Sequence, residues 1–228
     1  MPVLEIEELK KAFVPPGGTA PVPVVDIGSF SLEAGEHVAL SGSSGSGKTT
    51  LLHLVAGILA ADSGRVRVAG SDMTSLGEAG RDRLRAESIG YIFQTFNLLQ
   101  GYSCLENVLL GMSFGPGADV AHARSLLGRV GLADRLDYLP RQLSTGQQQR
   151  VAVARAVANR PRLVLADEPT GNLDPSNARQ ALELIRGICT ENNAALLLVS
   201  HDPAVLASFQ RVVSLSELNR AARKGVAP

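Results

Sequence analysis

The segment from Gly42 to Thr49 has the composition of a loop that binds phosphate groups. Its sequence, GSSGSGKT, fits the pattern G-x-x-x-x-G-K-[ST]. Glycines let the backbone curl until successive N–H groups face one anion. Lys48 can reach the β- and γ-phosphates, and the hydroxyl of Thr49 suits Mg²⁺. The loop stands between a strand-like run at 36–40 and the apolar helical run TTLLHLVAGIL, as phosphate binding at a helix N-terminus requires. A chance match is rarer than about one chain in a hundred, so we expect a nucleoside triphosphate site.

Two adjacent carboxylates, Asp167 and Glu168, follow the apolar run LVLA of a predicted buried strand. At the carboxyl end of a parallel strand, both would face the crevice in which open α/β sheets bind ligands. Asp167 then suits Mg²⁺, directly or through water, and Glu168 suits positioning or deprotonating an attacking water. A solvated Asp-Glu pair at a strand end is common, but the phosphate loop upstream favours the functional interpretation.

The run LLLVSHD repeats this arrangement on a second predicted strand and places His201 at its end. A lone histidine in such a position is more often structural than catalytic. Here it could reach the γ-phosphate beside Glu168 as a hydrogen-bond donor. His37 and His53 fit no chemical pattern, and we interpret both as structural.

The order of the predicted elements indicates an α/β fold. Strands are predicted at 3–9, 24–32, 36–40, 65–68, 89–93, 163–166, 194–200 and near 211–215, and helices from about 48, at 176–191 and after Pro203. Strands that alternate with helices favour a mostly parallel, doubly wound sheet. The stretch 95–158 shows no clear strand, and we expect it to be a helical insertion. The chain is thus predicted to be one domain, 1–228, with a core of 1–94 and 159–228 and a helical subdomain of 95–158.

Composition limits the classes of function that remain. The 228 residues include 22 Lys plus Arg and 22 Asp plus Glu, so no net field attracts nucleic acid or an anionic membrane. Cys104 and Cys189 have no metal-ligand spacing, and a reducing compartment with free thiols is the simplest interpretation. We expect no signal peptide and no membrane span, so a partner would have to supply any spanning segment.

The segment Leu143 to Arg150, LSTGQQQR, resembles the signature of the ATP-binding cassette (ABC) family. The resemblance extends over nearly the whole chain and implies a P-loop NTPase sheet core, an antiparallel β subdomain and an inserted helical subdomain. In that family the signature completes the nucleotide site of a second subunit packed head to tail, with its serine and glycine on the γ-phosphate. Ser144 and Gly146 match those two positions.

Further positions match functional residues of the family, with ATP and Mg²⁺ as the implied cofactors. Gln94 matches the Q-loop glutamine, Asn172-Leu173-Asp174 the D-loop, and Phe13 the aromatic residue that stacks on adenine, where it is as easily a core residue. The implied catalytic residues are Glu168, His201 and Lys48, and the implied metal ligands are Thr49, Gln94 and Asp167. The implied nucleotide contacts are Phe13, Gly42, Ser43, Ser44, Gly45, Ser46, Gly47, Lys48, Thr49, Thr50, Gln94, Ser144, Thr145, Gly146, Gln147 and Asp174.

Two stretches, FQTFNLLQGYSCLENV and QQQRVAVARAVANRPRLVLADEPTGNLD, are most similar to the ATPases of lipoprotein-releasing and macrolide-efflux systems. The resemblance implies a homodimeric motor that closes around ATP, moves a separate integral membrane permease, and works in the cytoplasm on the inner membrane. The alternative is an ATP-switched regulatory or scaffolding subunit, as in cell-division complexes of the same family. Action on nucleic acid is disfavoured by the neutral net charge.

The chain departs from the family pattern in four places. Thr145 stands where glycine is usual in the signature, and its β-branched side chain should weaken closure of the dimer. Gln100-Gly101 replaces a proline near the expected permease contact. The loop at 15–23 is long, and the C-terminal run VVSLSELNRAARKGVAP lacks the usual Asp-Gly hairpin. We expect neither of these last two features to touch the chemistry.

Overall fold

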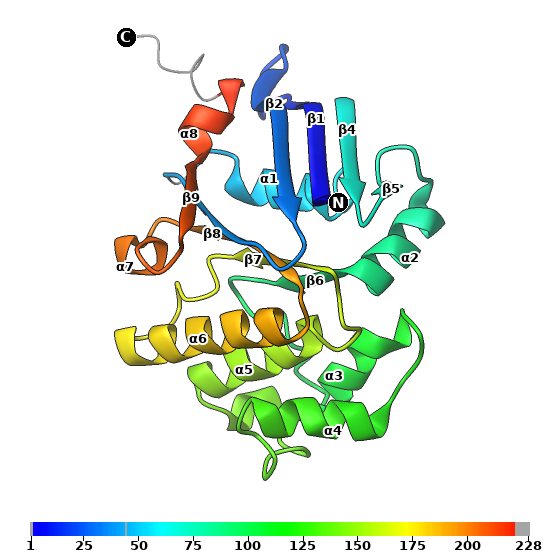
Figure 1. Ribbon diagram of the computed structural model, residues 1–228, viewed down its shortest axis with the longest axis vertical. Helices are drawn as coiled ribbons and strands as arrows, with labels where there is room; N and C mark the ends of the chain where they lie inside the picture. The colour runs from blue at the N-terminus through cyan, green and yellow to red at the C-terminus, as the bar shows by residue number, and fades with distance from the viewer. Residues whose placement is uncertain (1, 44, 222–228) are drawn as a thin grey trace.

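The structure is a computed structural model that describes residues 2–43 and 45–221. It contains two sheets, one above the other in Figure 1. The antiparallel sheet has the order β2-β1-β4-β5, with β1 at Pro2–Phe13, β2 at Val22–Glu33, β4 at Ser63–Val68 and β5 at Ser71–Asp72. The five-stranded sheet has the order β6-β7-β8-β3-β9, and all its pairings are parallel. Its strands are β3 (His37–Ser41), β6 (Ile89–Ile92), β7 (Leu163–Asp167), β8 (Ala195–Ser200) and β9 (Arg211–Ser214).

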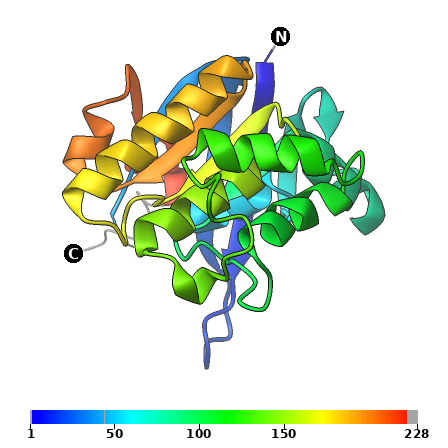
Figure 2. The same ribbon diagram turned by 90° about the horizontal axis from the view of Figure 1, so that it is seen from below.

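Helices cover both faces of the parallel sheet. Helix α1 (Lys48–Val55) lies between the two sheets, and α2 (Glu78–Ser88) leads into β6. On the other face lie α5 (Thr145–Ala156) and α6 (Pro175–Glu191), followed by α3 (Cys104–Ser113) and α4 (Val120–Arg129), as Figure 2 shows from below. Three short helices complete the described chain: η1 (Pro140–Gln142), α7 (Pro203–Leu206) and α8 (Leu215–Leu218). The expected α/β class with a strand-poor middle is confirmed.

Alternation along the buried strands divides the interior into two clusters. Along β7, Leu163 and Leu165 pack toward α1 and the antiparallel sheet, whereas Val164 and Ala166 pack toward the helical side. Successive side chains of a strand point to opposite faces of the sheet. Because both faces of this sheet are covered, its central strands are apolar on both sides, which explains the runs LVLA and ALLLV. These apolar runs therefore place the parallel sheet at the centre of the fold. The candidate site lies at the carboxyl ends of its strands.

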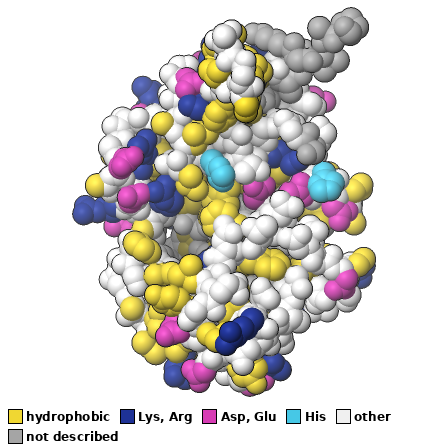
Figure 3. Space-filling view, turned by 180° about the vertical axis from the view of Figure 1, so that it is seen from behind, with side chains coloured by type: hydrophobic (Ala, Val, Ile, Leu, Met, Phe, Trp, Pro, Cys, Tyr) yellow, Lys and Arg dark blue, Asp and Glu magenta, His cyan; other side chains and the backbone are white. Residues whose placement is uncertain are grey.

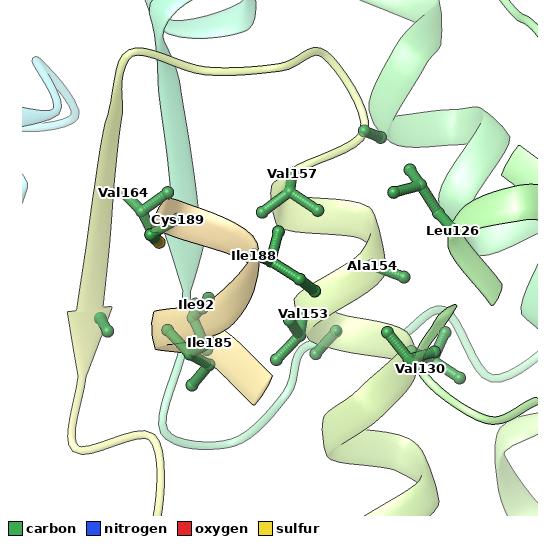
Figure 4. Close-up of a cluster of buried hydrophobic side chains, with 14 of the residues drawn as sticks. Ile92, Leu126, Val130, Val153, Ala154, Val157, Val164, Ile185, Ile188 and Cys189 are labelled. Atoms are coloured by element: carbon green, nitrogen blue, oxygen red, sulfur yellow. The ribbon is translucent and has the colours of Figure 1, made fainter. Parts of the chain in front are cut away.

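The helical segment shares its core with the sheet. In Figure 4, Cys189 of α6 lies near Val164 of β7, and Val153 of α5 and Val157, which follows α5, continue the cluster toward α4. The cysteines Cys104 and Cys189 are both buried and free, as expected. The helices therefore stand in fixed positions relative to the strand ends that carry the chemistry.

Candidate functional site

The phosphate loop connects the end of β3 to the start of α1. Helix α1 begins at Lys48, and its N-cap, Gly47, has a φ of 90°. A Cβ atom at this position would lie 2.9 Å from the carbonyl oxygen of Val24, so only glycine fits both the backbone conformation and the space. Gly45 also has a positive φ, 77°. The loop has the expected strand–loop–helix context, and its Ser44 lies outside the described residues.

The side chain of Lys48 lies along the inside of this loop. Its Nζ donates hydrogen bonds to the carbonyl oxygens of Gly42 and Ser43, at 2.8 and 2.9 Å, and lies 3.5 Å from Oε1 of Glu168. The side chain is almost fully buried. A buried ammonium group at the mouth of a phosphate loop supplies positive charge at a fixed point, where a β- or γ-phosphate could use it.

The carboxyl group of Asp167 lies at the end of β7, next to the start of α1. It accepts a hydrogen bond from the hydroxyl of Thr49. Burial raises the pKa of Asp167, and the neighbouring Glu168 raises it further. A desolvated carboxylate beside a hydroxyl oxygen is the kind of hard oxygen donor set that Mg²⁺ accepts together with phosphate oxygens and water. These residues therefore fit a magnesium ion.

Glu168 is buried and has a left-handed backbone, with a φ of 45°. Its N–H donates to the carbonyl oxygen of Val199 on β8, which fixes this strained turn at the strand exit. Its Oε1 lies 2.7 Å from Nδ1 of His201. The carboxylate is thus held between an imidazole and, at 3.5 Å, the Lys48 ammonium, an arrangement that can orient a water molecule and accept its proton.

These groups line one cleft of about 440 Å³. Residues that the sequence indicated and that the structure brings together here are Ser43, Gly45, Gly47, Lys48, Thr49, Thr50, Gln94, Asp167, Glu168 and His201. Val24 of β2 lines the same cleft and was not anticipated. The carboxyl edge of the parallel sheet, where β3, β7 and β8 end, therefore carries the candidate nucleotide site.

Two contacts hold the segment around Gln94, and the sequence did not indicate either. Nδ2 of Asn172 donates to the carbonyl oxygen of Gln94 at 2.7 Å. The guanidinium of Arg155 donates to the carbonyl oxygens of Asn97 and Phe96, at 2.5 and 2.6 Å. Phe96 and Asn97 both have left-handed backbones. These bonds give this segment a defined conformation beside the nucleotide cleft.

The signature residues lie in another place. Ser144 caps α5 through a hydrogen bond from the Gln147 N–H, with Gln147 bonding back to the Ser144 N–H. Ser144, Gly146 and Gln147 line a separate cleft of about 260 Å³, and Thr145 is exposed. Asp174 caps α6 by accepting from Ser176 and Asn177. None of these residues is among those that line the cleft containing Lys48.

Phe13 also lies apart from the residues that line the nucleotide cleft. It stands at the end of β1 with 41% of its surface exposed, and the ammonium of Lys11 lies 5.5 Å from its ring centroid. It is therefore no core residue. Its contact with a base stays a prediction.

The family model for the ABC transporter matches residues 25–171. The chain belongs to this family. It is similar to the lipoprotein-releasing system ATP-binding protein LolD 2 of Rhodospirillum rubrum, with 46% identity over 94% of each chain. It is 42% identical to LolD of Hydrogenovibrio crunogenus, again over 94% of each. The macrolide export ATP-binding/permease protein MacB of Syntrophobacter fumaroxidans is 40% identical over 95% of this chain, which spans only 31% of MacB.

Solved cassettes have the same fold. A dimeric, post-hydrolysis structure of the ATP-binding cassette MJ0796 with ADP and Pi superposes with a TM-score of 0.85 at 29% identity, covering 96% of this chain and 95% of that one. The expected ABC class and its lipoprotein-releasing and macrolide-export group are therefore confirmed, and this cassette is an ATPase by family. Within the described residues, no helix of the cassette has both the length and the apolar character to cross a membrane.

Proposed function

We propose that the cassette is the ATP-hydrolysing motor of a transport complex of the lipoprotein-releasing or efflux type. The observation that carries this proposal is the contact of 2.7 Å between Glu168 and His201, at the mouth of the phosphate loop. A subunit that only bound ATP as a switch would not need a carboxylate held in this way. The complete catalytic set therefore favours a motor over a regulatory scaffold.

The chemistry follows from how each group is held. The phosphate loop and Lys48 would bind the β- and γ-phosphates, while Thr49 and Asp167, with Gln94 beside them, would hold Mg²⁺. The ion would neutralise phosphate charge. Glu168 would orient the attacking water in line with the γ-phosphate and accept its proton. His201, whose Nδ1–H would donate to the carboxylate, could donate from Nε2 toward the γ-phosphate as an imidazolium, in which both ring nitrogens carry protons.

A second copy of the chain would complete each site. In one chain the signature, with Ser144, Gly146 and Gln147, lies in a cleft apart from the phosphate loop. The α5 N-terminus is therefore available to an anion bound by another subunit. A head-to-tail pair brings both halves together, and the MJ0796 cassette to which this chain is similar has been solved as a dimer.

A permease would dock at an apolar groove of about 490 Å³ between the α2–β6 region and helices α3 and α5. Its wall includes Ile58, Tyr91, Phe93 and Phe114, and Phe114 is 74% exposed. Figure 3 shows apolar side chains gathered around a hollow on this side of the molecule. MacB is named as an ATP-binding and permease protein in one chain, and this cassette spans 31% of it. We therefore infer that a cytoplasmic helix of a separate membrane permease occupies the groove, and that the cassette works on the cytoplasmic face of the inner membrane.

Trapping the closed dimer tests the proposal. Light scattering with MgATP should detect a stable dimer of Glu168→Gln and mainly monomer for the wild type, because the mutant binds ATP but hydrolyses it far more slowly. Glu183→Gln, which makes the same substitution at an exposed position on α6, should behave as the wild type. Hydrolysis by Glu168→Gln should fall by about 10²–10⁴-fold. A mutant with unchanged hydrolysis would refute the assigned role of Glu168.

A further inference from the structure

The C-terminal segment 211–221 runs along the back of the phosphate loop. Strand β9 pairs with β3 up to Ser214 opposite Ser41, the last residue before the loop. Leu215 is buried, and a Cβ atom at Gly42 would lie 3.5 Å from its Cβ, which is ordinary contact. The segment that lacks the usual Asp-Gly hairpin therefore touches the nucleotide-binding loop directly.

Asn219 is the polar centre of this contact. It is 1% exposed and forms an isolated bridge with Ile27 of β2. Its Nδ2 donates to the carbonyl oxygen of Val24 at 2.8 Å and to that of Ser46 in the phosphate loop at 3.4 Å. Its Oδ1 accepts from the Asp26 N–H at 2.8 Å. One side chain thus joins the phosphate loop to the strand residue that lines the nucleotide cleft.

The surroundings keep Asn219 in this position. The N–H of Asn219 donates to the carbonyl oxygen of Leu215, and its Oδ1 also accepts from the N–H of Ala221. The next residue, Arg220, crosses β2 at Gly28, where any Cβ atom would lie 2.1 Å from its guanidinium nitrogen, and it pairs with Glu8. The close packing of Gly47 against Val24 and Asn219 leaves the loop little room to shift.

We propose that Asn219 is a positioning residue that holds the phosphate loop and Val24 in the geometry that binds nucleotide phosphates. It touches neither the substrate nor Mg²⁺ and acts through the backbone of Ser46 and Val24. Donors that are already fixed lose little freedom on binding, so a fixed loop binds its anion more tightly than a loose one. This inference rests on the proposed function as an ATP-binding motor.

Asn219→Asp tests the donor side of the contact. The substitution is isosteric and keeps the acceptor for Asp26, but it replaces the amide donor by a carboxylate oxygen facing two carbonyl oxygens. Both bonds from the amide, to Val24 and Ser46, are lost, and losing even one buried hydrogen bond shifts an equilibrium by about tenfold. Titration calorimetry of the full chain should therefore give a Kd for ADP about tenfold higher than wild type. The KM for ATP should rise with kcat nearly unchanged, which is the mark of lost uniform binding.

Asn107 of α3, which is not among the residues that line the nucleotide cleft, offers a matched control. It is 0% exposed, accepts from the Leu99 N–H and donates to the carbonyl oxygens of Leu99, Tyr102 and Ser103. Asn107→Asp should lower the melting temperature as Asn219→Asp does, yet leave the Kd for ADP unchanged. An equal rise in Kd for both variants would mean general destabilisation and would overturn the inference.

Two further outcomes separate the inference from the proposed function. If Asn219→Asp does not fold, Asn219→Ala removes the same donor without adding charge, and the same rise in Kd is expected. A wild-type Kd in a folded Asn219 variant overturns the positioning role and leaves the motor function intact. Absence of ADP and ATP binding by the wild-type chain would instead refute the proposed function, and the inference with it.

Discussion

Replacing Arg155 by methionine should loosen the segment that follows Gln94. The guanidinium donates to the carbonyl oxygens of Asn97 and Phe96, and methionine fills the space of the stem without donating. A hydrogen bond from a charged group contributes about 1.5–3 kcal/mol. Because Arg155 is only partly buried, we take the lower end for each of the two bonds. The expected loss in the free energy of unfolding is about 3 kcal/mol.

Urea denaturation followed by circular dichroism measures this loss. For a chain of this length, about 3 kcal/mol corresponds to a fall in melting temperature of roughly 6–12 °C. Arg155→Lys should lose less, since a lysine keeps the charge and can serve one carbonyl, but it lacks the planar fork that serves two. Arg129→Met is the matched control, because Arg129 pairs with Glu191 at the surface, where such a pair contributes about 0–1 kcal/mol.

The reasoning fails if Arg155→Met loses no more stability than Arg129→Met. That result would mean that water or another donor replaces the guanidinium at both carbonyl oxygens. ATP hydrolysis gives a second readout, because the same loop positions Gln94. We expect Arg155→Met to hydrolyse ATP more slowly than Arg129→Met at a temperature where both are folded.

Three further predictions concern single positions. Thr145→Gly should raise ATP hydrolysis, because it removes a β-branched side chain from the signature; equal rates would discard the idea. Burial raises the pKa of Asp167, so the folded chain binds that proton more tightly than the unfolded chain. The protonated Asp167 therefore contributes fully to the free energy of unfolding below about pH 4. This contribution is lost as pH rises through the pKa of Asp167 in the folded chain. At neutral pH, Asp167→Asn should therefore raise the free energy of unfolding by about 0.5–2 kcal/mol and abolish hydrolysis, and a less stable variant in thermal melts would contradict this. Gly90→Ala should cost about 1–3 kcal/mol in urea denaturation, because its Cβ would lie 2.3 Å from the Ala156 carbonyl oxygen; a wild-type midpoint would show that the two backbones can separate.

The phosphate loop and the ends of β7 and β8 could be predicted because their signals are local. Strand, glycine loop and helix follow one another between residues 37 and 55, and apolar runs of strand length precede Asp167 and His201. A parallel sheet then brings these strand ends together without further information. The signature was recognised from its resemblance to the family pattern, and its separation from the phosphate loop agrees with a role on a second subunit.

Elements without a clear apolar period were missed. Helix α2 has the sequence EAGRDRLRAES and buries only Ser88 among its residues, so no apolar stripe marks it. Helix α8 is a short turn after β9, and β5 has two residues. The supporting contacts were equally invisible: Asn219 lies 173 residues beyond Ser46, and Asn172 lies 78 beyond Gln94. Such pairs depend on the finished fold and leave no local pattern.

Helix α5 joins the two surfaces that the proposed motor would coordinate, the signature cleft and the apolar groove. Ser144 caps one end of it in the signature cleft, and Arg155 lies in its last turn, where it lines the apolar groove. Twelve residues of helix span about 18 Å, and buried residues such as Val151 and Val153 pack it into the shared core. A partner that shifts Arg155 would therefore move the signature with it, and would also pull on the carbonyl oxygens of Phe96 and Asn97 next to Gln94. In the proposed dimer, this helix would connect the groove to both halves of a nucleotide site, its own through Gln94 and the second subunit's through Ser144.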